Sequence, residues 1–235
     1  MKKKIFGLIC ARGGSKSIKN KNLKKIYKNK SLLQNSIEQG KKSKYINEVY
    51  VSSDSKIIIN QAKKAGAIIP FVRPKILAKD NAYEIDVWKH FIKFLLKKGN
   101  CPDYVVSIPT TSPLRKIKDI DNIIKKITKN NYDIVFSLTK TNKNPYFNLV
   151  EIKKNNIQIV KKIKKIVKNR QEAPKIMAIT TVAYAFKPEY IMSTKNIYSG
   201  KVGYIEIPQE RSLDIDSKFD LEIAKNLIKH AKKSV

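Results

Sequence analysis

The stretch that decides the fold is IFGLICARGGSKSIKNKNL, at residues 5–23. Its first six residues are mostly apolar, which predicts a buried strand over residues 5–10. Two adjacent glycines and several cations follow, so the strand ends in a basic turn. In a parallel sheet, ligands bind beyond the carboxyl ends of the strands, and glycines let backbone amides approach a phosphate closely. We therefore predict an α/β fold whose first turn binds phosphate.

The rest of the chain alternates apolar runs with amphipathic stretches. The spacing predicts helices over residues 32–42, 56–64, 83–98, 117–129 and 218–232. It predicts further strands over residues 48–51, 68–71, 104–108, 133–138, 176–186 and 202–207. Repeated strand–helix–strand order favours a mostly parallel sheet covered by helices on both faces.

Two features outside this alternation shape the expected architecture. Residues 145–165 are polar and asparagine-rich, which predicts β-hairpins in an arm inserted at about residues 140–175. The last helix is predicted to pack through Phe219, Ile223, Leu227 and Ile228. Because no internal repeat or long linker is present, we expect residues 1–235 to form a single domain.

The basic composition is informative mainly through its arginines. The formal net charge is +31, a value that usually suggests nucleic-acid binding. However, lysine supplies most of this charge and is spread along the whole chain, so we predict no specific nucleic-acid partner. Arginine alone offers a planar bidentate fork, so its few occurrences mark candidate functional positions. These are Arg12, Arg73, Arg115, Arg170 and Arg211.

Cysteine content and hydropathy indicate the cellular compartment. Cys10 and Cys101 lie in different segments without metal-ligand spacing, which predicts reduced thiols. No apolar run is long enough to span a membrane, so we expect a cytoplasmic protein without a membrane partner.

The turn after the first strand has the chemistry of a triphosphate site. Arg12 and Lys21 can neutralise phosphate charge, and Ser15 can donate to an oxygen. The pattern is neither a Walker A motif nor the dinucleotide fingerprint, which disfavours kinases and dehydrogenases. On spacing alone, a basic turn without any ligand explains these residues equally well.

Three acidic residues each have two interpretations. Asp214 and Asp216 are two residues apart in an extended stretch, so both face one side and suit a hard cation such as Mg²⁺. The alternative is that they mark the start of the last helix, with Ser217 as its cap. Asp80 is equally suited to bind nucleotide or to cap the helix that follows it.

The segment Ala11 to Leu23 resembles the nucleotide-binding loop of acylneuraminate cytidylyltransferases, the CMP-sialic acid synthetase family. Five further segments follow in the order expected for that family, and the resemblance spans nearly the whole chain. They are Val51 to Asp54, Arg73-Pro74 with Leu77 to Asp80, Thr110 to Arg115, Arg170 to Pro174, and Arg211 to Ser217.

This resemblance implies a Rossmann-like nucleotidyltransferase that joins CTP to an acidic nine-carbon sugar of sialic or legionaminic type, releasing pyrophosphate. It also implies Mg²⁺ or Mn²⁺ as cofactor, and a homodimer in which each arm helps cover the other subunit's sugar site. The nucleotide-binding residues that it implies are Ala11, Arg12, Gly13, Gly14, Ser15, Lys21, Asn22, Arg73 and Asp80. The residues that it implies bind the sugar or order the loops of the sugar site are Thr111, Ser112, Arg115, Arg170 and Gln171. It assigns the metal to Asp214 and Asp216, and catalysis to Arg12, Lys21 and Asp216.

The sequence departs from the sialate pattern at two places near the expected sugar site. Residues 178–182 read AITTV where sialate-specific members often have an Arg-x-Asn-Gly-Ala stretch, and Pro109-Thr110 replaces a Gln-Pro pair. These changes favour a legionaminate-like acceptor. The alternatives are pseudaminate, an eight-carbon keto acid, a different nucleotide, or a non-catalytic nucleotide- or RNA-binding protein.

Overall fold

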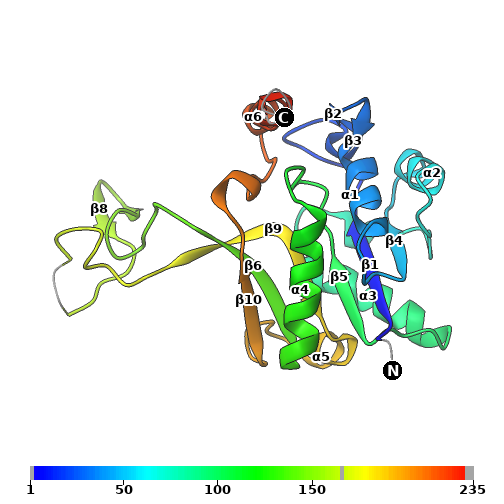
Figure 1. The fold of residues 1–235 in the computed structure, drawn as a ribbon. Coiled ribbons are helices and arrows are strands. Elements are labelled where there is room, and N and C mark those ends of the chain that lie inside the picture. The colour runs from blue at the N-terminus through cyan, green and yellow to red at the C-terminus, as the bar shows by residue number, and fades with distance from the viewer. Residues whose placement is uncertain (1–2, 165–166, 231–235) are drawn as a thin grey trace.

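The computed structural model of this chain describes residues 3–164 and 167–230. A six-stranded sheet in the order β10-β6-β9-β5-β1-β4 forms its centre (Figure 1). The strands are β1 (Ile5–Cys10), β4 (Glu48–Ser52), β5 (Tyr104–Ser107), β6 (Ile134–Lys140), β9 (Met177–Phe186) and β10 (Val202–Glu206). The β1–β4, β1–β5 and β6–β10 pairs are parallel, whereas β9 runs antiparallel to both its neighbours. The predicted mostly parallel α/β sheet is therefore confirmed.

Helices cover both faces of the sheet. They are α1 (Leu32–Lys41), α2 (Lys56–Lys64), α3 (Glu84–Lys97), α4 (Ile117–Asn130), α5 (Pro188–Ser193) and α6 (Lys218–His230), with 3₁₀ turns η1 (Lys21–Leu23), η2 (Lys75–Ala78) and η3 (Gln209–Arg211). Because successive strand side chains point to opposite faces, Ile5 and Ile9 pack towards α1, α2 and α4, whereas Phe6 and Leu8 pack towards α3 and α5. Two apolar cores thus hold the carboxyl ends of the central strands in place.

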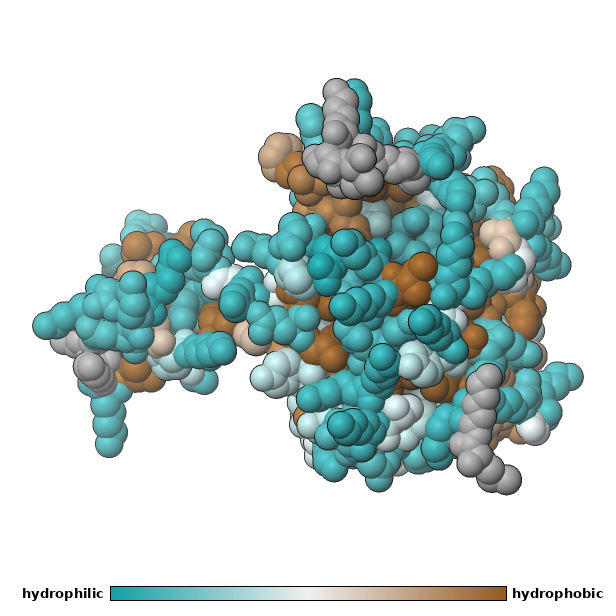
Figure 2. Space-filling model, viewed as in Figure 1, coloured by the Kyte–Doolittle hydropathy of each residue, from teal (hydrophilic) through white to brown (hydrophobic). Residues whose placement is uncertain are grey.

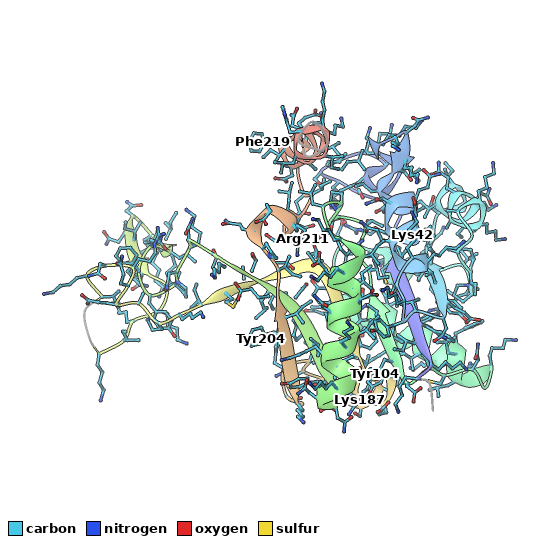
Figure 3. The ribbon with its side chains drawn as sticks, viewed as in Figure 1. Lys42, Tyr104, Lys187, Tyr204, Arg211 and Phe219 are labelled. Carbon is cyan, nitrogen blue, oxygen red and sulfur yellow. The ribbon has the colours of Figure 1, made fainter. Side chains whose placement is uncertain are left out.

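Two predicted features differ in the structure. Residues 68–71 form no strand; only isolated parallel bridges join Ile68 to Tyr50 and Val72 to Ser53. Pro70 lies between them and has no backbone N–H to donate to a ladder. The last helix is also turned relative to the prediction, because it buries Leu221 and Ala224 and leaves Phe219 73% exposed (Figure 3). Its predicted residues 231–232 lie outside the described residues.

An arm leaves the sheet between β6 and β9, near the predicted bounds (Figure 1). It carries a two-stranded antiparallel hairpin of β7 (Val150–Lys153) and β8 (Asn156–Ile159), as the sequence predicted. Ile152 and Ile157 on this hairpin are 78% and 71% exposed, and apolar residues are visible on the arm's surface (Figure 2). Such exposure in a projecting segment is typical of a contact surface.

A second small hairpin, β2 (Lys25–Tyr27) with β3 (Lys30–Ser31), packs beside α6. Ile26 from this hairpin shares a small apolar core with Ile18, Ile215 and Leu221. The turn after β1 is thereby joined to the segment that precedes α6. Within residues 3–164 and 167–230, every helix is too short or too polar to cross a membrane.

Candidate active site

A pocket of about 360 Å³ lies beyond the carboxyl ends of β1 and β5. We call it the loop pocket. It is lined by Cys10, Arg12, Ser15, Lys16, Ser17, Lys21, Asn22, Thr110, Thr111 and Asp216. Most of its polar lining consists of residues that the sequence singled out, contributed by three separate segments. The turn that was predicted to bind phosphate therefore forms part of the wall of a pocket.

The turn itself is held by backbone and side-chain hydrogen bonds. The Gly13 amide donates to Asp54 Oδ1 at 2.9 Å, and Asn22 Nδ2 donates to the Arg12 carbonyl at 2.9 Å. A Cβ on Gly13 would lie 2.9 Å from Ser55 Cβ, so the close approach requires glycine. The Thr110 hydroxyl donates to Asn22 Oδ1, the oxygen of the same side-chain amide. Asn22 thus braces the turn from within the pocket wall.

Two cations of the turn, Arg12 and Lys16, are paired with the carboxylate of Asp80. Arg12 Nη1 lies 2.7 Å and Lys16 Nζ 2.6 Å from Asp80, and these two groups lower the pKa of the Asp80 carboxyl. The N-cap of α3 is Tyr83, without a side-chain cap, so the capping alternative for Asp80 is wrong. Asp80 instead holds Arg12 and Lys16 beside the loop pocket, where a triphosphate would compete for them.

Lys21 connects the turn to the acidic pair that precedes α6. Its Nζ donates to the Ile215 carbonyl at 2.8 Å and lies 3.2 Å from Asp216 Oδ1. Ile215 is fully buried, and its amide donates to the Thr111 carbonyl at 2.9 Å. With Ile215 pointing into the core, the side chains on either side of it point the other way. The backbone between Asp214 and Asp216 is therefore held by Lys21 from the turn and by Thr111 from the segment after β5.

The start of α6 is capped without this acidic pair. The Ser217 amide donates to Asp220 Oδ2 at 2.7 Å, and the Asp220 amide donates to Ser217 Oγ at 3.2 Å. This reciprocal arrangement satisfies the first turn of the helix. Ser217 therefore caps α6 as expected, and the cap does not use the side chains of Asp214 and Asp216.

Asp214 lies two residues before Asp216, which lines the loop pocket. Burial raises the pKa of its carboxyl, which lies close to the hydroxyls of Thr111 and Thr181. Its Oδ1 is buried and has no hydrogen-bond partner in the part of the chain that the structure describes. Burial likewise raises the pKa of the Tyr184 hydroxyl, and the charges of Glu84 and Asp214 add to that rise. Tyr184 lines a second cavity, so the charge of Asp214 acts on a residue of that cavity, although Asp214 itself lines neither pocket.

The second cavity, the aromatic pocket, has a volume of about 380 Å³. It is lined by Tyr83, Glu84, Ile85, Trp88, Phe136, Ile179, Tyr184, Lys195, Asn196, Ile197 and Tyr198. Of these, only Ile179 lies in the stretch that the sequence marked as sugar-facing. The alternation in β9 placed Tyr184 and Phe186 on one face, but it could not show that the face opens at Tyr184. That opening depends on residues 195–198, which follow α5.

Comparison with known proteins identifies the family. Residues 6–232 match the sequence model described as cytidylyltransferase. The chain belongs to the cytidylyltransferase family. It is 32% identical over 225 residues to the CMP-N,N'-diacetyllegionaminic acid synthase of Campylobacter jejuni, covering 95% of this chain and 94% of that protein. It is 31% identical over 223 residues to the pseudaminic acid cytidylyltransferase of the same species, covering 94% and 95%.

A solved structure supports the fold of this cytidylyltransferase. The structure of CMP:2-keto-3-deoxy-manno-octonic acid synthetase complexed with CTP covers 97% of the chain with a TM-score of 0.73. The alignment spans 99% of that structure at 14% identity, which shows a common fold alone. The predicted Rossmann-like nucleotidyltransferase fold and the resemblance to acylneuraminate cytidylyltransferases are both confirmed.

The cytidylyltransferase has a donor set that fits a hard cation. Among the described residues, no group of three or more His, Cys, Asp or Glu side chains could hold a metal. Mg²⁺, however, is usually bound by one or two carboxylates together with substrate phosphates and water. Asp214, with its unpartnered buried oxygen, and the exposed Asp216 beside the loop pocket meet that requirement. These two residues would hold the ion.

Three predicted ligand-contacting residues of the cytidylyltransferase are buried. Arg115 is 2% exposed and donates to the carbonyls of Pro109 and Val182, while the Ser112 hydroxyl is fully buried against Thr181. Both side chains fix the segment after β5, which agrees with the expected role in ordering the loops of the sugar site and not with direct contact to the sugar. Arg73 is 4% exposed, donates to Ser52, and does not line the loop pocket.

Arg170 and Gln171 lie on the arm and not at either pocket of their own chain. Arg170 is exposed and donates to Asn142 Oδ1 at 3.0 Å, and Gln171 is exposed as well. Neither residue lines the loop pocket or the aromatic pocket. Sugar binding by these two residues therefore stays a prediction.

Proposed function

We propose that this cytidylyltransferase transfers CMP from CTP to an acidic nine-carbon sugar of the legionaminate type and releases pyrophosphate. The observation that carries the proposal is the pair of cavities in one chain: the cationic loop pocket, which Asp216 lines, and the aromatic pocket, whose Tyr184 is within reach of the charge of the neighbouring Asp214. A triphosphate fits the first pocket, and a sugar with apolar substituents fits the second. The names of the relatives from Campylobacter jejuni point to the same substrate class.

In this proposal, the residues of the loop pocket position the triphosphate and neutralise its charge. Arg12 exchanges Asp80 for phosphate oxygens, Ser15 donates to the triphosphate, and Lys21 stabilises the charge that develops during transfer. The anomeric hydroxyl of the sugar attacks the α-phosphorus, the new O–P bond forms, and the bond to the β-phosphate oxygen breaks. Asp216, beside Lys21, accepts the proton of the hydroxyl.

A divalent cation, when bound, would neutralise charge on the phosphate oxygens. Asp214 and Asp216 are the residues that would hold it, with Mg²⁺ the expected ion and Mn²⁺ a substitute. Lys21 and Thr111 fix the backbone between these two carboxylates, which keeps both directed towards the triphosphate.

The aromatic pocket supports an acceptor with few hydroxyls on its tail. Phe136 and Ile179 present apolar side chains to this pocket, so a hydroxyl group that faces them would be left unpaired, at roughly 1–3 kcal/mol. A deoxygenated tail that ends in a methyl group loses less. Legionaminate is therefore the proposed acceptor, and pseudaminate is the nearest alternative.

We further propose a homodimer in which the arm of each subunit reaches the acceptor site of the other. Arg170 would then pair with the acceptor carboxylate, which explains why it lies on a projecting arm. The exposed Ile152 and Ile157 of the arm hairpin would be covered by the second subunit. Sedimentation of the purified chain, with and without residues 141–176, tests the dimer.

Pyrophosphate release tests the reaction. The purified protein is incubated with Mg²⁺, each of the four ribonucleoside triphosphates, and a panel of N,N'-diacetyllegionaminate, N,N'-diacetylpseudaminate, N-acetylneuraminate and an eight-carbon keto acid. We expect release with CTP, fastest with diacetyllegionaminate. If N-acetylneuraminate is better by about tenfold or more, the acceptor assignment is wrong. CTP binding without release for any acceptor would instead support a non-catalytic protein.

A further inference from the structure

Strand β9 carries a bulge that the proposed mechanism does not use. The register of β6 against β9 shifts between Phe136 and Leu138, so that Ser137 lies opposite residues 180–183. Ser137 is fully buried, and its Oγ accepts from the Ala183 amide at 3.2 Å and lies 2.9 Å from the Ala183 carbonyl. A bulge of this kind re-aims side chains that would otherwise alternate between the two faces of the sheet. The bulge is therefore a built feature of the core.

Thr181 is the side chain that the bulge presents to the segment after β5. Its Oγ1 lies 2.7 Å from Ser112 Oγ and accepts from Thr111 Oγ1 at 3.4 Å. Ser112 is fully buried, and Thr181 is the partner of its hydroxyl among the described residues. The sialate pattern has glycine at the position of Thr181, so this hydroxyl distinguishes the present chain from that pattern.

The Thr181 hydroxyl also lies beside the carboxylate of Asp214. Burial raises the pKa of this carboxyl, and the nearby hydroxyls of Thr111 and Thr181 counteract the rise. Asp214 Oδ1 is buried and has no hydrogen-bond partner in the described part of the chain. A carboxylate that binds a cation is usually oriented by hydrogen-bond donors of the protein around it. The hydroxyls of Thr111 and Thr181 are in the right place for that task.

The hydrogen atoms of these hydroxyls can be assigned from the chemistry of their partners. An ionised carboxylate only accepts, so a hydroxyl that binds Asp214 must donate to it. When Thr181 donates to Asp214, its oxygen is left to accept, and Ser112 donates to that oxygen. In such a series each hydroxyl polarises the next, so the buried Ser112 orients Thr181, and Thr181 orients the carboxylate.

We infer that Thr181 is a positioning residue, which donates a hydrogen bond to Asp214 and holds this carboxylate in the orientation that binds the divalent cation. This role rests on the proposed function, in which Asp214 holds Mg²⁺, and it adds the residue that orients that ligand. It also gives the bulge in β9 a purpose, because the bulge presents the Thr181 hydroxyl to Ser112 and Asp214.

The variant Thr181→Val removes the hydroxyl and keeps nearly the same shape. CTP is not consumed without an acceptor, so electron paramagnetic resonance can measure the Kd of the protein–CTP complex for Mn²⁺, corrected for Mn²⁺ on free CTP. We expect this Kd to rise by at least about tenfold, the lower end for removing a residue that orients a metal ligand. Thr181→Ser, which keeps the hydroxyl, should restore the wild-type Kd.

Thr139→Val is the matched control for the loss of a hydroxyl. Thr139 lies on β6, next to β9, and its buried Oγ1 has no hydrogen-bond partner among residues 3–164 and 167–230. The substitution is the same as at position 181, but it breaks no contact with Asp214. Its Kd for Mn²⁺ should equal that of the wild type.

The variant Ser112→Ala separates positioning from packing. It should weaken Mn²⁺ binding by itself, so the inference stays testable even if Thr181→Val does not fold. Because Ser112 acts through Thr181, the double variant should bind Mn²⁺ no more weakly than Thr181→Val alone. It should also have an equal or higher Tm than Thr181→Val, in which the Ser112 hydroxyl has lost its partner. Losses of Mn²⁺ affinity that add would overturn the inference.

Two further outcomes would overturn it. An unchanged Kd for Mn²⁺ in Thr181→Val, with a raised KM for the acceptor, would show that Thr181 contacts the sugar instead. A wild-type CTP complex that binds no Mn²⁺ would remove the metal role of Asp214 and, with it, the role of Thr181. Failure of the proposed reaction would look different, because Mn²⁺ would bind the CTP complex and no acceptor would release pyrophosphate.

Discussion

Replacing Lys21 with methionine isolates the charge that joins the turn to the acidic pair. Methionine retains much of the length and apolar volume of the stem, which is only 14% exposed, but it has no ammonium group. The variant loses the bond to the Ile215 carbonyl and the contact with Asp216. It should lower kcat by at least about a hundredfold, the scale for removing one electrostatic stabiliser of a developing charge.

The stability cost of this variant should be modest. An unpaired Ile215 carbonyl costs roughly 1–3 kcal/mol, and the contact with Asp216 adds little because that carboxylate is 76% exposed. For a chain of this size, each kcal/mol lowers Tm by about 2–4 °C. A folded but nearly inactive protein is therefore expected.

Pyrophosphate release under saturating CTP measures kcat, and thermal unfolding measures stability. Lys19→Met is the matched control, because Lys19 is exposed on the same turn and does not line the loop pocket. It removes the same formal charge and should retain near-normal turnover. If Lys21→Met stays within about threefold of the wild-type kcat, Lys21 does not act on the triphosphate and the reasoning fails.

Three further predictions, one of them with a control variant, concern the residues around the loop pocket. Gly13→Ala forces the new Cβ against Ser55, and the displaced turn should raise the KM for CTP by about tenfold. Gly14→Ala, with open space around it, should leave that KM unchanged. Equal KM values for the two variants would contradict this prediction. Asp214→Asn should abolish turnover. Its Tm should be unchanged or higher, because the substitution neutralises a buried carboxylate whose Oδ1 has no hydrogen-bond partner among the described residues. Full activity of this variant, or of the wild type in EDTA, would exclude the metal role. Arg211→Lys breaks the bidentate pair with Asp119, so it should destabilise the fold by roughly 1–3 kcal/mol. It should also raise the Mg²⁺ concentration that gives the half-maximal rate. If this concentration equals that of the wild type, Arg211 has no positioning role.

The central strands and the glycine-containing turn after β1 could be predicted because their signals are local. A β-branched run fixes a buried strand, and adjacent glycines permit a close turn whatever the rest of the chain does. The common face of Asp214 and Asp216 followed in the same way from the period of an extended segment. The arm hairpin was also predictable, because its polar composition interrupts an otherwise regular alternation.

The aromatic pocket could not be predicted, because residues from distant segments form it. Glu84 and Trp88 come from α3, Tyr184 from β9, and Tyr198 from the segment after α5. Each has a common local role in its own element, such as an acid in the first turn of a helix or an aromatic residue in a strand. Only the packing of α3 and α5 on one face of the sheet brings them together around a cavity.

The arginines show how a correct chemical argument led to some wrong positions. Arginine is irreplaceable by lysine where several donors must bind in a fixed plane, but that plane need not face a ligand. Arg115 donates to the carbonyls of Pro109 and Val182, which are far apart in sequence. Arg211, labelled in Figure 3, donates to the carboxylate of Asp119 at the start of α4. Both anchor the segments that carry the pocket residues Thr111 and Asp216. Because the reaction needs those segments in register, an arginine that binds only protein can be as constrained as one that binds phosphate, and a lysine at either position should reduce activity through geometry and not through lost charge.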